Sequence, residues 1–166
     1  MALVPSWAKG ISTGNRMINA RAETQAEKSS FKRWLKKHRC LVVADGFYEW
    51  RKNAKGKVPM LFKLKSGALF VFAGLWDVWT KPDGQTLRTY NIVTTEPNDL
   101  AVSVHNRMPV MLNDSNALDW LKGDEIEHAL SLLKPFSADL MDGYEVSKLL
   151  NSPSNDRPEG IAPINE

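Results

Sequence analysis

The sequence is poor in the residues that hold metals or form disulfides. Its single cysteine, Cys40, excludes an internal disulfide, which fits a reducing cytoplasm. The 3 histidines are scattered without the spacing of a zinc site, so we expect no metal. The phosphate-loop pattern GxxxxGK[ST] does not occur, and nothing else in the sequence predicts a cofactor.

Long apolar runs and a targeting segment are also absent from the sequence. No run approaches the roughly 18 residues of a membrane span. The start "MALVPSWAKG" has no basic region leading into an apolar core. With 43% hydrophobic and 25% charged residues, the 166-residue chain is typical of a soluble globular protein. We expect one domain over residues 1–166, a monomer without a membrane partner, and a cytoplasmic location. The net charge of +3 permits a nucleic-acid partner but does not require one.

The pattern of residues predicts an α+β fold. A helix is expected from Thr24, which has capping-box spacing to Glu27, and Phe31, Trp34 and Leu35 form its apolar stripe. Residues 39–45, 47–52, 59–65, 68–79 and 87–95 read as strands separated by turn sequences. They predict a mostly antiparallel sheet that curls or forms a barrel-like shape. Short helices are expected at 96–104, 115–121 and 124–133, and Asp124 is expected to cap the last of them. A final strand is expected at 143–150, followed by an extended tail.

Three polar residues stand in apolar settings, in the segments "INARAET", "DGFYEW" and "VHNRMPV". They are Asn19, Glu49 and His105. Each has a structural explanation: an amide bonded to a loop backbone, a carboxylate paired with a buried arginine such as Arg21 or Arg107, and a hydrogen-bonded core histidine. Taken one at a time, the structural explanation is favoured. Together, an amide, a carboxylate and an imidazole make a set that can carry acid–base chemistry.

Six motifs make the sequence similar to a known family. In chain order they are "LVPSWAK", "INARAET", "RCLVVADGFYEW", "AGLW", "HNRMPV" and "LLNSPSNDRPEGIAPI". They resemble the SRAP family, the SOS-response-associated peptidases, also called abasic-site processing proteins. In that family the first methionine is removed to expose an N-terminal cysteine. The amine and thiol of this cysteine react with the aldehyde of an abasic site in single-stranded DNA and form a thiazolidine cross-link.

The resemblance implies roles for individual residues of this chain. Asn19, Glu49 and His105 match the residues that line the family's site, and Arg21 matches a DNA-phosphate contact. We assign Arg107 to the DNA as well. Trp50 could stack on bases, and for Trp7 stacking and core packing are equally plausible. We expect Tyr48 and Trp50 to desolvate Glu49 and raise its pKa. For a bacterial protein, the implied partner also suggests association with the nucleoid.

The chain departs from the family at its start. Position 2 is Ala2, and the family's "MCGR" segment is not found. Cys40 cannot replace that cysteine, because a thiazolidine needs the amine and thiol of one residue. We interpret Cys40 as a small core residue. Three explanations are open: a lost 5′ end of the coding sequence, an inactive remnant, or a chain that binds single-stranded DNA without cross-linking. The first is favoured because the other motifs are intact. Whether the chain is an enzyme is left undecided.

Two non-family alternatives also follow from the sequence. In one, the chain is a binding module that holds single-stranded DNA through Arg21, the basic helix of residues 28–39 and exposed tryptophans. In the other, it is a globular domain whose polar residues only complete the core. A protease acting on other proteins is less favoured, because no serine or cysteine has a recognisable nucleophile setting.

Overall fold

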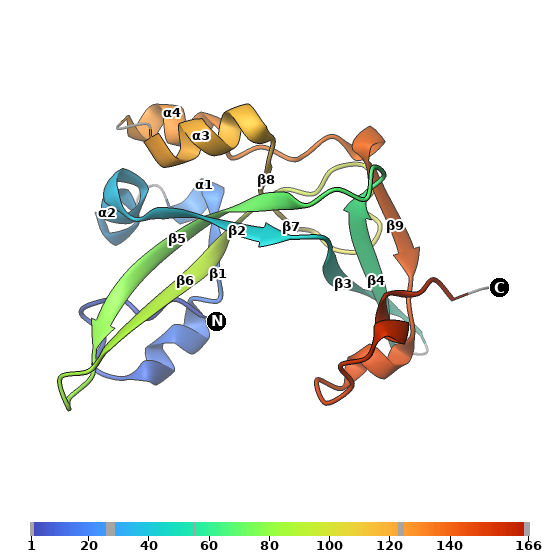
Figure 1. The fold of residues 1–166 in the computed structure, drawn as a ribbon, viewed down its shortest axis with the longest axis horizontal. Helices are drawn as coiled ribbons and strands as arrows, with labels where there is room; N and C mark the ends of the chain where they lie inside the picture. Colours follow the sequence, from blue (N-terminus) through green and yellow to red (C-terminus); the bar gives the residue numbers. More distant parts are fainter. Residues whose placement is uncertain (1, 26–28, 55, 123–124, 165–166) are drawn as a thin grey trace. The chain divides into compact units, whose positions relative to one another are not determined.

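The computed structural model describes residues 2–25, 29–54, 56–122 and 125–164 (Figure 1). They cluster into two compact units, each assembled from three separate segments. The first unit comprises residues 1–43, 71–95 and 109–136, and the second comprises 44–70, 96–108 and 137–166. Each unit is described by itself. One domain over residues 1–166 stays a prediction.

The first unit is built on a mixed sheet whose strands run in the order β1-β6-β5-β2. Strands β5 (Phe70–Thr80) and β6 (Thr86–Thr95) form a long antiparallel hairpin that curls along its length (Figure 1). Strand β1 (Asn19–Arg21) pairs in parallel with β6, and β2 (Arg39–Ala44) ends the order. The short strands β7 (Met108–Pro109) and β8 (Met111–Leu112) pair with β6 and β5.

Helices cover the core of the first unit. Helix α2 (Ser29–Lys37) buries Phe31, Trp34 and Leu35, as the predicted stripe requires. It contacts α4 (Ile126–Ser131), while α3 (Asp114–Lys122) contributes the fully buried Trp120. The remaining helical segments are the one-turn α1 (Ala22–Gln25) and the 3-10 helix η1 (Ile11–Arg16). Thr24 lies within α1, while its predicted capping partner Glu27 and the predicted cap Asp124 lie outside what the structure describes.

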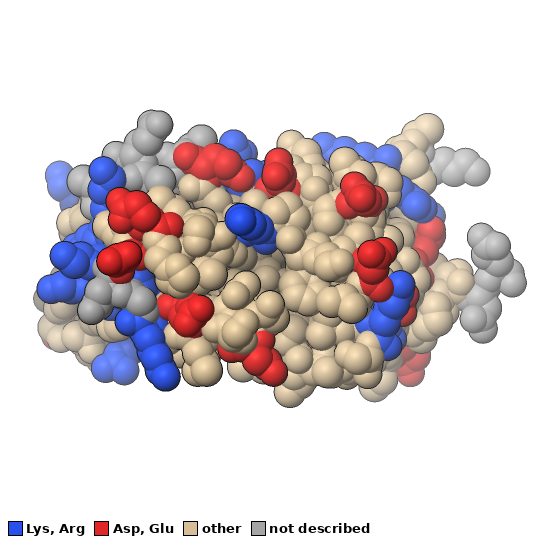
Figure 2. Space-filling model, turned by 90° about the horizontal axis from the view of Figure 1, so that it is seen from above, with Lys and Arg blue, Asp and Glu red and all other residues tan. Residues whose placement is uncertain are grey.

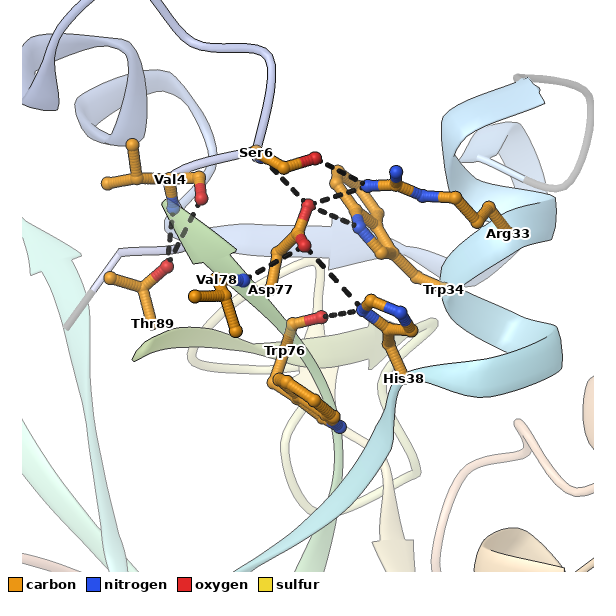
Figure 3. A network of polar contacts seen from close by, with 9 residues as sticks. All are labelled: Val4, Ser6, Arg33, Trp34, His38, Trp76, Asp77, Val78 and Thr89. Carbon is orange, nitrogen blue, oxygen red and sulfur yellow. Dashed lines mark hydrogen bonds and ion pairs between the residues drawn. The ribbon is translucent and has the colours of Figure 1, made fainter. Parts of the chain in front are cut away.

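A buried carboxylate ties three parts of the first unit together (Figure 3). Asp77 on β5 is 2% exposed. One of its oxygens accepts hydrogen bonds from the Ser6 amide at 2.9 Å, the Arg33 guanidinium at 2.7 Å and the Trp34 indole at 3.0 Å. The other accepts from the Val78 amide at 2.9 Å. The amino-terminal segment and helix α2 are therefore attached to the sheet through one side chain.

The second unit is a three-stranded antiparallel sheet in the order β3-β4-β9. Strands β3 (Phe47–Asn53) and β4 (Gly56–Leu64) form a hairpin, and β9 (Met141–Glu145) pairs with β4. Gly143 lets β9 lie directly on the Phe62 ring, since a Cβ there would fall 2.7 Å from it. Three 3-10 helices follow or precede β9: η2 (Ala138–Leu140), η3 (Lys148–Asn151) and η4 (Pro158–Ile161).

The α+β class, the mostly antiparallel pairing and the curled sheet are confirmed, while several local predictions are wrong. Residues 99–104 form turns instead of a regular helix, although the Asn98 side chain accepts the Leu100 and Ala101 amides as a helix cap would. The strand expected at 143–150 ends at Glu145 and gives way to η3. The tail contains η4, so it is not simply extended.

Candidate functional site

Strand β1 presents two of the predicted site residues on one face. Its three residues alternate exposed, buried, exposed, so Ala20 enters the core while Asn19 and Arg21 point to the other side. The parallel register pairs Asn19 with Ile92 and Arg21 with Thr94. An amide and a guanidinium are thus held about 7 Å apart along one strand, in the first unit.

Strand β3 in the second unit carries Glu49, with Tyr48 and Trp50 on its opposite face. The Tyr48 and Trp50 rings contact each other with centroids 6.5 Å apart, as residues two apart on a strand do. Glu49 therefore points away from both rings, and the prediction that these aromatics desolvate it is wrong. On its own face the carboxylate is in register with the buried Met60 of β4, which in turn is in register with Glu145 of β9.

The carboxyl of Glu49 is half-buried, and burial raises its pKa, as predicted in direction. The charge of His105 and a hydrogen bond from the Trp50 backbone amide oppose the rise without cancelling it. This electrostatic contact places Glu49 and His105 near each other in the second unit. A carboxyl with a raised pKa near an imidazole is an arrangement typical of sites that carry general acid–base chemistry.

His105 follows the turns of residues 99–104, and its ring is held by the backbone that comes next. The Nδ1 atom lies 3.2 Å from both the amide nitrogen and the carbonyl oxygen of Arg107. In the neutral ring, Nδ1 accepts the Arg107 N–H and the proton sits on Nε2. In the charged ring, Nδ1–H can donate to the carbonyl instead. The Arg107 backbone therefore supports either protonation state.

A hollow of about 330 Å³ lies along the free edge of β3, beside His105. It is lined by Trp50, Arg51, Lys52 and the loop of residues 103–106. The indole nitrogen of Trp50 donates to the Asn151 side chain at 2.8 Å, which fixes the ring beside the hollow. Arg51 is paired with Glu145 at 3.1 Å. An aromatic ring, cations and an imidazole therefore share one cavity in the second unit.

The remaining predicted site residues are placed as follows. Trp7 is 63% exposed in the first unit, so core packing does not account for it. Arg107 is half-buried in the second unit. Asn19 and Arg21 belong to the first unit, whereas Glu49, His105 and Trp50 belong to the second. The prediction that Asn19 lies beside Glu49 and His105 stays a prediction.

On one face of the molecule, charge is spread in small groups (Figure 2). On the face shown in Figure 2, basic and acidic side chains both occur between broad neutral areas, and basic ones are more frequent toward the end where α2 lies. This distribution agrees with the modest net charge of +3. Binding of a polyanion would therefore depend on local cations.

Cys40 is packed against the first unit's sheet. A Cβ at Gly74 would lie 2.8 Å from its sulfur, so the thiol fills the space that this glycine leaves. Burial raises the pKa of the Cys40 thiol to about 11. It is half-buried, close to the predicted core role, and is not an activated nucleophile.

We expect the native protein to resist alkylation at Cys40. With a pKa of about 11 the thiolate fraction at pH 8 is roughly two orders of magnitude below that of a free cysteine. Iodoacetamide should label the urea-unfolded chain at least 100-fold faster than the folded chain, as followed by intact mass. Equal rates would show that Cys40 is accessible and reactive.

Two further observations concern the described residues only. None of the described helices has the length and apolar character needed to cross a membrane. Within the same residues, no three histidine, cysteine, aspartate or glutamate side chains gather in a way that could hold a metal ion.

Comparison with known proteins identifies the family. Residues 1–153 match the family model "SOS response associated peptidase (SRAP)". The chain belongs to the SRAP family. Over 162 residues, it is 50% identical to the abasic site processing protein YoqW of Bacillus subtilis, covering 96% of this chain and 72% of YoqW. It is 34% identical to the abasic site processing protein HMCES of Gallus gallus, covering 98% of this chain but 55% of HMCES.

A solved structure supports the SRAP fold. A protein from Bacteroides thetaiotaomicron superposes with a TM-score of 0.88 at 31% identity, covering 98% of this chain and 74% of that one.

Reasoning from the sequence missed three features of this SRAP chain: Asp77, the Arg51–Glu145 pair and strand β1. The first had a signal, since Asp77 interrupts the apolar run "FVFAGLWDVW".

Proposed function

We propose that this chain binds single-stranded DNA containing abasic sites, and that a form beginning with the family's cysteine cross-links to the lesion. The observation that carries the proposal is the half-buried Glu49 carboxyl, with its raised pKa, beside His105 at the family's motif positions. The names of the relatives support abasic-site processing as the activity.

The proposed chemistry needs proton transfer at two steps. The cysteine amine adds to the sugar aldehyde to form a carbinolamine, which must lose its hydroxyl as water to give an imine. The thiol then adds across the C=N bond: sulfur bonds to carbon, and the nitrogen takes up a proton. Glu49 in its protonated form can supply the proton that water carries away, and the imidazole of His105 can accept and donate protons in turn. Asn19 would hold the amine or sugar without adding charge.

The proposed DNA contacts are made by basic and aromatic side chains. Arg21 would bind a phosphate, Trp50 and Trp7 would stack on bases, and Arg107 would contact the strand. The exposure of Arg21 and Trp7 supports these roles. The chain would act as a monomer in the cytoplasm. The family's self-processing, removal of the first methionine, would account for the peptidase label.

A second candidate function is single-stranded DNA binding without cross-linking. It is favoured by one observation: the 166 residues hold no cysteine except Cys40, whose amine is a peptide nitrogen within β2. This candidate shares the DNA site with the first and differs only in the covalent step.

We expect the 166-residue chain to bind single-stranded DNA in a salt-dependent way and to form no heat-stable cross-link with it. Each phosphate contact releases a counterion, so the logarithm of the binding constant should fall linearly with the logarithm of salt concentration. Fluorescence anisotropy on a labelled oligonucleotide with one abasic site measures the affinity, and denaturing gel electrophoresis detects any cross-link. An oligonucleotide of the same length without the lesion serves as the control. Affinity that is independent of salt, or a heat-stable band, would contradict this account.

A further inference from the structure

Two lysines face each other at the tip of the β3–β4 hairpin. The register of the two strands pairs Lys52 directly with Lys57, and both side chains are exposed. Like charges opposite each other on neighbouring strands destabilise a sheet. At an exposed position solvent and salt screen this repulsion, and an anion between the two ammonium groups would relieve it further.

The lysine pair differs from the neighbouring Arg51 in its ion pairing. Arg51 forms its ion pair with Glu145. Among the residues that the structure describes, no carboxylate forms an ion pair with Lys52 or Lys57. The pair therefore presents two positive charges that a ligand can use.

The lysine pair also lies in line with the candidate site. Lys52 lines the same 330 Å³ hollow as His105 and Trp50. It lies on the same face of β3 as Trp50, opposite to the face of Glu49, and is three residues along the strand from Glu49, which is about 10 Å at 3.3 Å per residue. A DNA strand with its lesion at Glu49 and His105, following the free edge of β3 past Trp50, would bring a flanking phosphate to the hairpin tip.

We propose that Lys52 and Lys57 form a clamp for a backbone phosphate one or two nucleotides from the lesion. This inference rests on the proposed function, since it extends the same DNA site along β3. It assigns the hairpin to the binding of the flanking strand, and the chemistry at the lesion remains with Glu49 and His105. The two ammonium groups act as point charges on the phosphate oxygens.

Exposed lysines on an edge strand also discourage pairing with a second chain. That role would be indifferent to DNA and would show itself as aggregation when the lysines are removed. The two roles are separated by measuring affinity and oligomeric state on the same variants.

The test is anisotropy titration of the full chain and of the double variant Lys52→Gln/Lys57→Gln with abasic single-stranded DNA over a range of salt concentrations. The loss of the clamped phosphate should weaken binding several-fold at low salt and reduce the salt slope by roughly 0.7. The control is Lys65→Gln/Lys134→Gln, which removes the same charge at two exposed positions away from the hairpin tip and should change both values much less. The titration is repeated with two shorter oligonucleotides, one that ends at the lesion on its 5′ side and one that ends there on its 3′ side. The difference in affinity between the variant and the unmodified chain should be seen with only one of them.

The outcomes separate the two proposals. If the unmodified chain binds with a salt slope and the hairpin variant binds as the control does, the clamp is wrong and the proposed function stands. If the unmodified chain does not bind single-stranded DNA, both are wrong. The clamp is supported if the hairpin variant binds more weakly only when one flank of the DNA is present, and if it elutes from size-exclusion chromatography at the same volume as the unmodified chain.

Discussion

Replacing Asp77 with alanine is expected to destabilise the protein by about 2–4 kcal/mol, because a buried donor left without its acceptor costs about 1–3 kcal/mol, while Arg33, whose side chain is 45% exposed, can turn to solvent. The substitution leaves the Trp34 indole and the Ser6 and Val78 amides without their acceptor, and it releases Arg33 (Figure 3). Urea denaturation measures the loss. Asp142→Ala, at an exposed position of β9, is the control and should change stability by less than about 0.5 kcal/mol. A loss below about 1 kcal/mol for Asp77→Ala would show that the network is not needed for the fold.

The same carboxylate should make the protein sensitive to acid. Burial alone would raise the pKa of Asp77, but the Ser6 amide, the Trp34 indole, the Val78 amide and Arg33 together lower it. A lowered pKa means that the stabilisation is present above the unfolded value of about 3.9 and is lost as pH falls through the folded value. The difference in stability between the unmodified protein and Asp77→Asn should therefore narrow below about pH 4.

Replacing Glu49 with glutamine is expected to abolish cross-linking while leaving stability unchanged or higher. General acid–base catalysis contributes about 10²–10⁴-fold, which sets the expected loss of rate in a form that carries the family's N-terminal cysteine. The raised pKa of Glu49 means that its carboxylate is less favourable in the folded than in the unfolded chain. Glutamine removes that penalty at pH 7–8.

The raised pKa of Glu49 also determines how its contribution to stability changes with pH. A raised folded pKa contributes stability that is complete below the unfolded value of about 4.3 and is lost as pH rises through the folded value. The Glu49→Gln variant should thus gain relative stability as pH rises from 4 to 8. If Glu49 only completes the core, the same substitution should lower the melting temperature at pH 7. Glu145→Gln, in register across β4, tests whether any nearby carboxylate gives the same response.

The parts of the fold that depend on local patterns were predictable from the sequence. The apolar stripe of α2 and the strands β2 to β6 follow from periodicity and turn residues, which act between neighbours in the chain. Strand β1 was not predictable, because three residues carry no period and its pairing with β6 depends on the fold. The turns at 99–104 were missed because the segment begins as a helix does, with Asn98 accepting the Leu100 and Ala101 amides, and the sequence does not show that a regular helix fails to continue.

The candidate site was predictable only through motifs that resemble a family. Composition and spacing did not separate Glu49 or His105 from core residues. The structure adds their proximity and the hollow beside them. The orientation of Glu49 was within reach of the sequence, since alternation along a strand already places it opposite Tyr48 and Trp50. The Lys52–Lys57 pair needed the register of the strands, and the partners of Asp77 on α2 and the amino-terminal segment needed the fold, neither of which the sequence alone supplies.

The central claim is that Glu49 and His105 carry proton transfer at an abasic site. The most direct test is the rate of heat-stable cross-link formation with abasic single-stranded DNA, measured for a cysteine-starting form of the protein and for its Glu49→Gln and His105→Ala variants. Melting temperatures are recorded on the same samples. The account predicts rates reduced at least 100-fold with folded, stable variants. Unchanged rates, or a loss of rate only in proportion to unfolding, would contradict it.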